Sequence, residues 1–264
     1  MITTRALGGG AILRRFAGAL FWLALAGMFL AVAGPSAAEG KYGGSWGLPD
    51  DYSTHGHKID KLFYVILWVT GIVFVLTEVA LVWFLFKYRR RDGRKAKYTH
   101  GSTAVEAVWT VVPAVIILTM AFSSRALWKE LKQDMPPDAL NLKVVGEQFA
   151  WNVLYPGPDG MLDTADDMLS LNIMHIPVHK PVVVTLTSKD VIHSFFLPEF
   201  RVKQDAVPGM TSQVWVEATQ TGTFDIACAE LCGLGHYRMK GYLMVDTPED
   251  YESFLAELAE EQEE

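Results

Sequence analysis

The chain has 264 residues, half of them apolar, and a formal net charge of -7. The charge is unevenly divided: residues 1–135 carry 16 basic and 9 acidic side chains, whereas residues 136–264 carry 7 basic and 21 acidic ones. A basic, apolar half joined to an acidic half indicates a membrane anchor followed by an exterior domain. The acidic half excludes nucleic acid as a partner, because it repels phosphate and attracts basic proteins.

The N-terminal part has the pattern of a secretory signal over residues 1–38. Arginines stand at its start, residues 16–34 are apolar, and small side chains suited to cleavage follow. The apolar run is also long enough for a third membrane helix, which is the alternative interpretation. The next stretch, residues 39–58, is rich in glycine and predicts a loosely ordered exterior segment in which His55 and His57 are solvated.

A membrane hairpin is predicted for residues 59–135. Its two spans are residues 62–86 and 104–122, and the first would reach about 37 Å, enough to cross about 30 Å of hydrocarbon. Seven Lys or Arg and one Asp lie between the spans, in residues 87–97, and such loops stay cytoplasmic. Both mature termini are therefore expected on the outer side. Glu78 lies inside the first span and should face protein or water, because a carboxylate is costly in lipid.

The pattern changes to short strands separated by turns over residues 136–246, which predicts an all-β Greek-key sandwich. The tail, residues 247–264, predicts a helix capped by Thr247, with an apolar stripe that docks on the sandwich and an acidic end. The candidate strands are residues 142–154, 181–188, 212–217, 223–228 and 241–245.

One short stretch concentrates soft metal ligands. Cys228, Cys232, His236 and Met239 lie within twelve residues, and His193 is the obvious further ligand. Thiolate, thioether and imidazole favour copper over hard cations. A disulfide, a structural zinc site and a one-copper site are the alternatives that composition leaves open. The second cysteine is what a second copper would need, with both sulfurs bridging the two metals.

The pattern Cys-x-Glu-x-Cys-x3-His-x2-Met, preceded by Ser-Lys-Asp-Val-Ile-His-Ser-Phe, resembles subunit II of haem-copper cytochrome c oxidases. The resemblance implies a cupredoxin-like domain that holds a dinuclear copper centre, CuA. It implies Cys228 and Cys232 as bridging thiolates, and one imidazole ligand for each copper. The complete set of implied copper ligands is His193, Cys228, Glu230, Cys232, His236 and Met239.

The resemblance also implies the role of the chain. Cytochrome c would give one electron at a time to CuA, which passes it to haem in subunit I, where oxygen becomes water and protons are pumped. Met239 would be a weak axial ligand, while Glu230 would bind copper through its carbonyl and a magnesium ion, shared with subunit I, through its side chain. The expected location is the bacterial inner membrane, beside subunits I and III, with the copper domain in the periplasm. A copper-free quinol oxidase subunit and a copper carrier are the alternatives.

Other positions match the family less completely. Glu106 corresponds to the mouth of a proton channel, and Asp205 to an acidic position used for donor docking. Phe149 stands where the family has the tryptophan that accepts the electron, and Trp151 aligns with the second tryptophan, so these two are the candidates for electron uptake. The acidic insert at residues 156–168 is expected to be a solvated loop, with a calcium site as the alternative.

Overall fold

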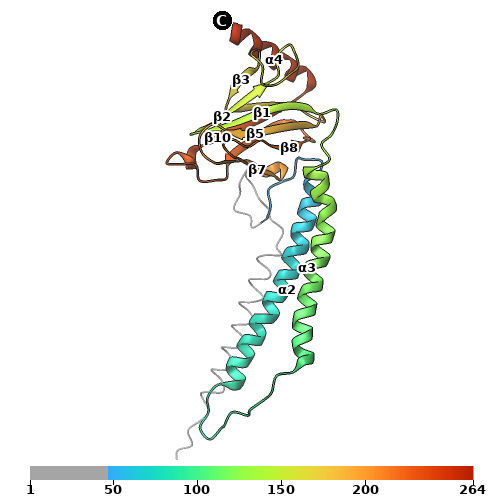
Figure 1. Cartoon of the computed structure of the whole chain (residues 1–264), viewed down its shortest axis with the longest axis vertical. Coiled ribbons are helices and arrows are strands. Elements are labelled where there is room, and N and C mark those ends of the chain that lie inside the picture. Colours follow the sequence, from blue (N-terminus) through green and yellow to red (C-terminus); the bar gives the residue numbers. More distant parts are fainter. Residues whose placement is uncertain (1–46, 264) are drawn as a thin grey trace, which may run out of the picture. The chain divides into compact units, whose positions relative to one another are not determined.

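The computed structural model describes residues 47–263. The predicted signal over residues 1–38 therefore lies outside the described residues, as does the exterior segment up to residue 46. From there the element order is two long helices, ten short strands and a C-terminal helix (Figure 1). This order confirms the predicted class of an apolar helix pair, a β-sandwich and a terminal helix.

The two apolar helices are α2 (Gly56–Tyr88) and α3 (Thr103–Lys132). Both are long and apolar enough to cross a membrane. They are longer than the predicted spans because polar turns extend them at the ends near the sandwich. There Lys58 at the start of α2 pairs with Glu130 near the end of α3, so the two helices run antiparallel. Trp215 donates from Nε1 to the Glu130 carbonyl at 3.1 Å, which ties this end of α3 to the sandwich.

The segment before α2 differs from its expectation. The backbone N–H of Tyr52 donates to the Glu199 carbonyl at 2.9 Å, and its carbonyl accepts from the Thr219 N–H at 2.9 Å. The imidazole of His55 is 1 % exposed and packs edge-on against Trp215, with ring centroids 4.8 Å apart. The prediction of loose order and a solvated His55 was therefore wrong for residues 52–55, because this segment hydrogen-bonds the sandwich and buries the ring. His57 is exposed, as predicted.

Two five-stranded sheets form the sandwich, with mixed parallel and antiparallel pairing. The first has the order β3-β2-β1-β5-β8 and the second the order β4-β10-β9-β6-β7. The first sheet consists of β1 (Leu140–Glu147), β2 (Ala150–Tyr155), β3 (Met168–Leu171), β5 (Val182–Ser188) and β8 (Ser212–Val216). The second consists of β4 (Ile173–Pro177), β6 (His193–Leu197), β7 (Val202–Ala206), β9 (Gly222–Cys228) and β10 (Lys240–Asp246).

Side chains alternate between the core and the surface along these strands, as a half-buried sheet requires. The rings of Trp151 and Phe195, one from each sheet, meet edge to face with centroids 5.6 Å apart. The single strand predicted over residues 142–154 is instead β1 and β2, joined by a turn at Gln148 and Phe149 and paired antiparallel. Apolar side chains alternate on both sides of that turn, so the sequence pattern does not reveal the turn.

The C-terminal helix, α4 (Pro248–Glu263), has the predicted cap. The Thr247 hydroxyl accepts from the Asp250 N–H at 3.2 Å and donates to the Asp250 carboxylate at 2.8 Å. Tyr251 and Leu258 are buried, and the rings of Phe254 and His175 stack with centroids 3.7 Å apart. The predicted apolar stripe therefore docks α4 on the sandwich.

Removing this cap should loosen α4. We expect Thr247→Ala to lower the free energy of unfolding by about 1 kcal/mol, because the Asp250 N–H loses its acceptor. Thr247→Ser keeps the hydroxyl and is the matched control. Urea denaturation of the detergent-solubilised chain, followed by tryptophan fluorescence, measures the difference. Identical unfolding midpoints for the Ala and Ser variants would contradict the capping role.

Candidate metal centre

The predicted ligands come from two strand ends and the loop between β9 and β10. His193 is the first residue of β6, and Cys228 is the last residue of β9. The two strands pair directly, with Phe195 opposite Cys228. This pairing brings His193 to the loop that holds Cys232 and Met239, although 35 residues separate it from Cys228 in the sequence.

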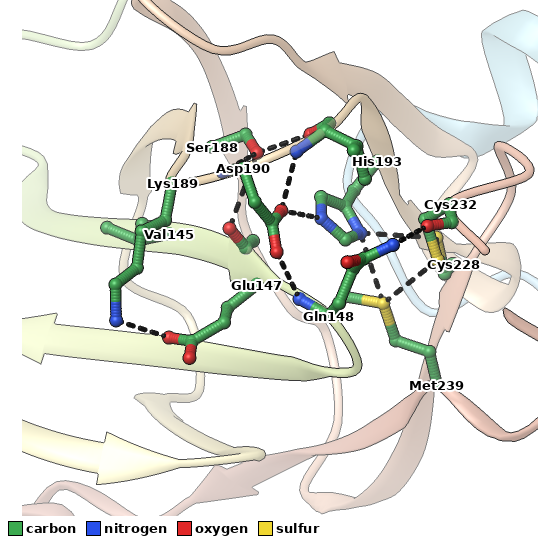
Figure 2. A network of polar contacts seen from close by, with 12 residues as sticks. Val145, Glu147, Gln148, Ser188, Lys189, Asp190, His193, Cys228, Cys232 and Met239 are labelled. Carbon is green, nitrogen blue, oxygen red and sulfur yellow. Dashed lines mark hydrogen bonds and ion pairs between the residues drawn. The ribbon is translucent and has the colours of Figure 1, made fainter. Parts of the chain in front are cut away.

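The side chains of His193, Cys228, Cys232 and Met239 converge on one point (Figure 2). The Cys228 and Cys232 sulfur atoms are 3.9 Å apart, and both cysteines are free, so the disulfide alternative is not what the structure shows. The Nδ1 atom of His193 lies 3.2 Å from the Met239 sulfur and 4.0 Å from the Cys228 sulfur. The Cys232 sulfur lies 3.7 Å from Nδ1 of His236 and 3.6 Å from the Met239 sulfur.

One backbone oxygen adds to this set of donors. The Glu230 carbonyl lies 3.2 Å from the Cys228 sulfur, while the Glu230 side chain is exposed. One ligand atom each from His193, Cys228 and Cys232 lies within 4.8 Å of the others, the spacing of a group that could hold a metal ion. Two thiols, imidazole nitrogen and a thioether suit a soft metal such as copper.

The site is closed to solvent on its inner side. His193 is 0 % exposed, and Cys232 and Met239 are each 3 % exposed. Burial raises the pKa of the Cys232 thiol to about 11, and the neighbouring Cys228 adds to this effect. A metal that binds the Cys232 thiolate must therefore displace a proton at neutral pH.

A second layer of contacts, which the sequence pattern does not predict, surrounds the ligands. Asp190 Oδ1 lies 2.9 Å from Nε2 of His193, and its Oδ2 accepts from the Gln148 N–H at 2.8 Å. The Gln148 side chain donates to the Cys232 carbonyl at 2.5 Å. Burial raises the pKa of Asp190, but the hydrogen bonds that it accepts outweigh this and leave its pKa below the usual value. The sequence feature that could have indicated the role of Asp190 is its position three residues before a candidate ligand histidine, His193.

The two aromatic candidates for electron uptake lie next to the ligands. Trp151 is 0 % exposed, and its ring centroid is 5.9 Å from that of His193. Phe149 is half-buried and packs against Gly235, where a Cβ atom would come within 2.4 Å of the ring. Trp151 therefore cannot touch a partner protein directly, whereas Phe149 keeps part of its ring at the surface.

The remaining candidates lie outside the ligand group. Asp205 is exposed, and its carboxylate accepts a hydrogen bond from the Ser194 hydroxyl at 2.7 Å. Ser194 is the residue that follows His193 in the chain. Glu106 is exposed in the first turn of α3 and takes no part in the metal group. In the 156–168 loop, the carboxylates of Asp159, Asp166 and Asp167 accept hydrogen bonds from backbone N–H groups of the same loop.

Comparison with known proteins gives this geometry a family context. The model of cytochrome c oxidase subunit II, periplasmic domain, matches residues 140–245, and that of the transmembrane domain of the same subunit matches residues 42–127. The alternative cytochrome c oxidase subunit 2 of Bradyrhizobium diazoefficiens is 33% identical over 225 residues, covering 77% of this chain and 81% of the relative.

Two further similarities are found. Cytochrome c oxidase subunit 2 of Cereibacter sphaeroides is 32% identical over 234 residues, covering 77% of this chain and 76% of the relative. The crystal structure of the periplasmic domain of subunit II of cytochrome oxidase of Bradyrhizobium japonicum is 32% identical, with a TM-score of 0.42, covering 48% of this chain and 98% of that one.

A side chain at Gly235 should disturb the metal group. The new Cβ in Gly235→Ala would meet the Phe149 ring at 2.4 Å, so the ring or the ligand loop must shift. We expect weaker metal binding, by about 1–3 kcal/mol. Competition with a chelator measures the affinity, and the double variant with Phe149→Ala should recover it. Unchanged affinity in Gly235→Ala would contradict the close packing of ring and loop.

Metal uptake should depend on pH. Since the raised pKa of Cys232 keeps its thiol protonated below about pH 11, the apparent affinity for a thiolate-binding metal should rise with pH, by about tenfold per unit for each proton displaced. Chelator competition between pH 6 and 8 gives the slope. Met239→Leu should lower the affinity without changing the slope, because a thioether carries no proton. An affinity independent of pH would contradict this account.

Proposed function

The chain belongs to the cytochrome c oxidase subunit II family, and we propose that it takes electrons from cytochrome c at a dinuclear copper centre and passes them to haem in subunit I. It is a subunit of an oxidoreductase complex, and oxygen reduction with coupled proton pumping would take place in subunit I. The observation that carries the proposal is the pair of unbonded cysteine sulfurs 3.9 Å apart, next to Nδ1 of His193 and the Met239 sulfur.

The donor set fits two coppers better than one metal. In the proposed arrangement, both metals would be held by the sulfurs of Cys228 and Cys232, and each would take one imidazole. His193 would serve one copper and His236 the other. A one-copper site needs only one thiolate, and a structural zinc site needs no thioether. Once bound, a copper pair supplies a centre that accepts and releases single electrons with little change in geometry, because two metals share the charge.

Two further atoms complete the proposed set of copper ligands. The Met239 sulfur lies within 3.6 Å of both the His193 nitrogen and the Cys232 sulfur, and it would be a weak ligand of one copper. The Glu230 carbonyl faces the Cys228 sulfur at 3.2 Å and would bind the second copper. The exposed Glu230 side chain remains available for the magnesium ion that we propose to be shared with subunit I.

The surface near the site suits a basic donor. Residues 136–264 carry a net charge of -14, so a positively charged cytochrome c is drawn to this domain. Asp205 is exposed beside the His193 strand and belongs to the proposed docking surface. Phe149 would contact the donor, and the electron would tunnel past it, because Trp151 lies behind the surface in the core.

The helices fit the membrane part of this role. α2 and α3 are transmembrane helices, and the protein fits an inner-membrane location. We propose that both mature termini and the copper domain face the periplasm, beside subunits I and III. Glu106, in the first turn of α3, would stand at the mouth of a proton channel that leads into subunit I. Residues 1–38 would be removed as a signal.

Metal counting on the full-length chain tests the proposal. The purified, detergent-solubilised protein is loaded with copper, and copper per chain is measured together with the electron paramagnetic resonance spectrum. We expect two coppers and a mixed-valence signal from one electron shared equally between them. Cys228→Ser should remove the shared-electron signal, while Asp205→Asn, which changes no ligand, should keep it. One metal per chain, or a one-copper spectrum, would overturn the proposal.

A further inference from the structure

We propose that Asp190 is a positioning residue for the metal centre: its carboxylate holds the His193 ring so that Nδ1 faces the sulfurs, and its charge lowers the reduction potential of the bound metal. This inference rests on the proposed function. Asp190 is not one of the six proposed ligands. Together with Gln148, in the turn between β1 and β2, it links His193 to the Cys232 loop (Figure 2).

The two nitrogens of the His193 ring have different surroundings. Nε2 lies 2.9 Å from Asp190 Oδ1, whereas Nδ1 lies 3.2 Å from the Met239 sulfur and 4.0 Å from the Cys228 sulfur. A carboxylate accepts hydrogen bonds, so the ring proton belongs on Nε2 and the lone pair on Nδ1. The ring therefore presents its lone pair to the metal position before any metal binds.

Asp190 is itself held in place from several directions. Its Oδ2 accepts from the Gln148 N–H at 2.8 Å, its Oδ1 accepts from the Val191 N–H at 2.6 Å, and its own N–H donates to the Ser188 hydroxyl at 3.3 Å. A carboxylate fixed by these contacts has little freedom to leave the His193 ring. It can therefore orient the ligand without an entropic cost when the metal binds.

The same network reaches the second ligand loop. Gln148, in the turn between β1 and β2, donates from its side chain to the Cys232 carbonyl at 2.5 Å. Through its backbone N–H and its side chain, this one residue joins Asp190 and the Cys232 loop. The His193 loop and the cysteine loop are thus held in register by a turn of the other sheet, which limits their movement when the charge on the metal changes.

The charge of Asp190 gives the inference a measurable consequence. A carboxylate hydrogen-bonded to a ligand imidazole increases the basicity of that imidazole and favours the more positive, oxidised metal. Asp190→Asn keeps an oxygen that can accept from Nε2 but removes the charge, so the reduction potential should rise. Asp190→Ala removes both the charge and the acceptor, so the potential should rise and the ring should lose its orientation.

The experiment uses the full-length chain in detergent with three variants: Asp190→Asn, Asp190→Ala and Glu147→Gln. Glu147 is the matched control, because its carboxylate pairs with Lys189 at 3.0 Å on the same rim but contacts no ligand. Copper affinity is measured by chelator competition, and the reduction potential by spectroelectrochemistry. We expect Asp190→Ala to lose about 10- to 100-fold in affinity, Asp190→Asn to retain most of the affinity with a raised potential, and Glu147→Gln to match the wild type in both.

A metal-free readout separates this inference from the proposed function. Nitrogen chemical shifts of the His193 ring should show the Nε2–H tautomer in the metal-free wild type and in Asp190→Asn, and a mixture of tautomers in Asp190→Ala. If the chain bound no copper pair but the tautomers followed this pattern, the proposed function would fail and the positioning role of Asp190 would stand. An Asp190→Ala variant with the affinity, potential and tautomer of Glu147→Gln would overturn the inference.

Discussion

The approach of two cysteine sulfurs to 3.9 Å without a bond between them is the constraint on which the rest of the site depends. Cys228 is fixed by the last pairing of β9 with β6, and the same ladder carries His193 into the group. Cys232 is held by Gln148 through its carbonyl, and its burial keeps the thiol protonated until a metal replaces the proton. A short loop between β9 and β10 thus holds a set of soft ligands in place before any metal binds.

The sandwich supports this loop from behind. Trp151 packs against the rings of both His193 and Phe195, so the wall of the metal site is continuous with the hydrophobic core. Protein interiors are closely packed and resist deformation. A ligand set mounted on such a wall should change shape little if a bound metal gains or loses one electron, as the proposed function requires. Phe149 is half-buried, so part of its ring lies at the surface that a donor would approach.

Much of this arrangement could be predicted from the sequence, for identifiable reasons. The two membrane helices follow from long apolar runs, and α4 follows from Thr247 and its apolar stripe, because these signals are local. The cysteine loop is also local. His193 could be named as a candidate ligand, but its approach to the loop depends on the pairing of β6 with β9, which the sequence does not reveal. Asp190 was missed because its role depends on which ring nitrogen faces the metal. The buried His55 was missed because its partner ring lies in β8, far along the chain.

Copper X-ray absorption on the loaded full-length chain tests whether both sulfurs bridge two coppers. We expect each copper to have two sulfur neighbours, one imidazole nitrogen and a second copper at short distance. We also expect the copper–copper contribution to disappear in Cys232→Ser. A spectrum with one sulfur for each copper and no metal neighbour would contradict the bridged pair, and so would sulfurs found bonded to each other in the copper-loaded protein.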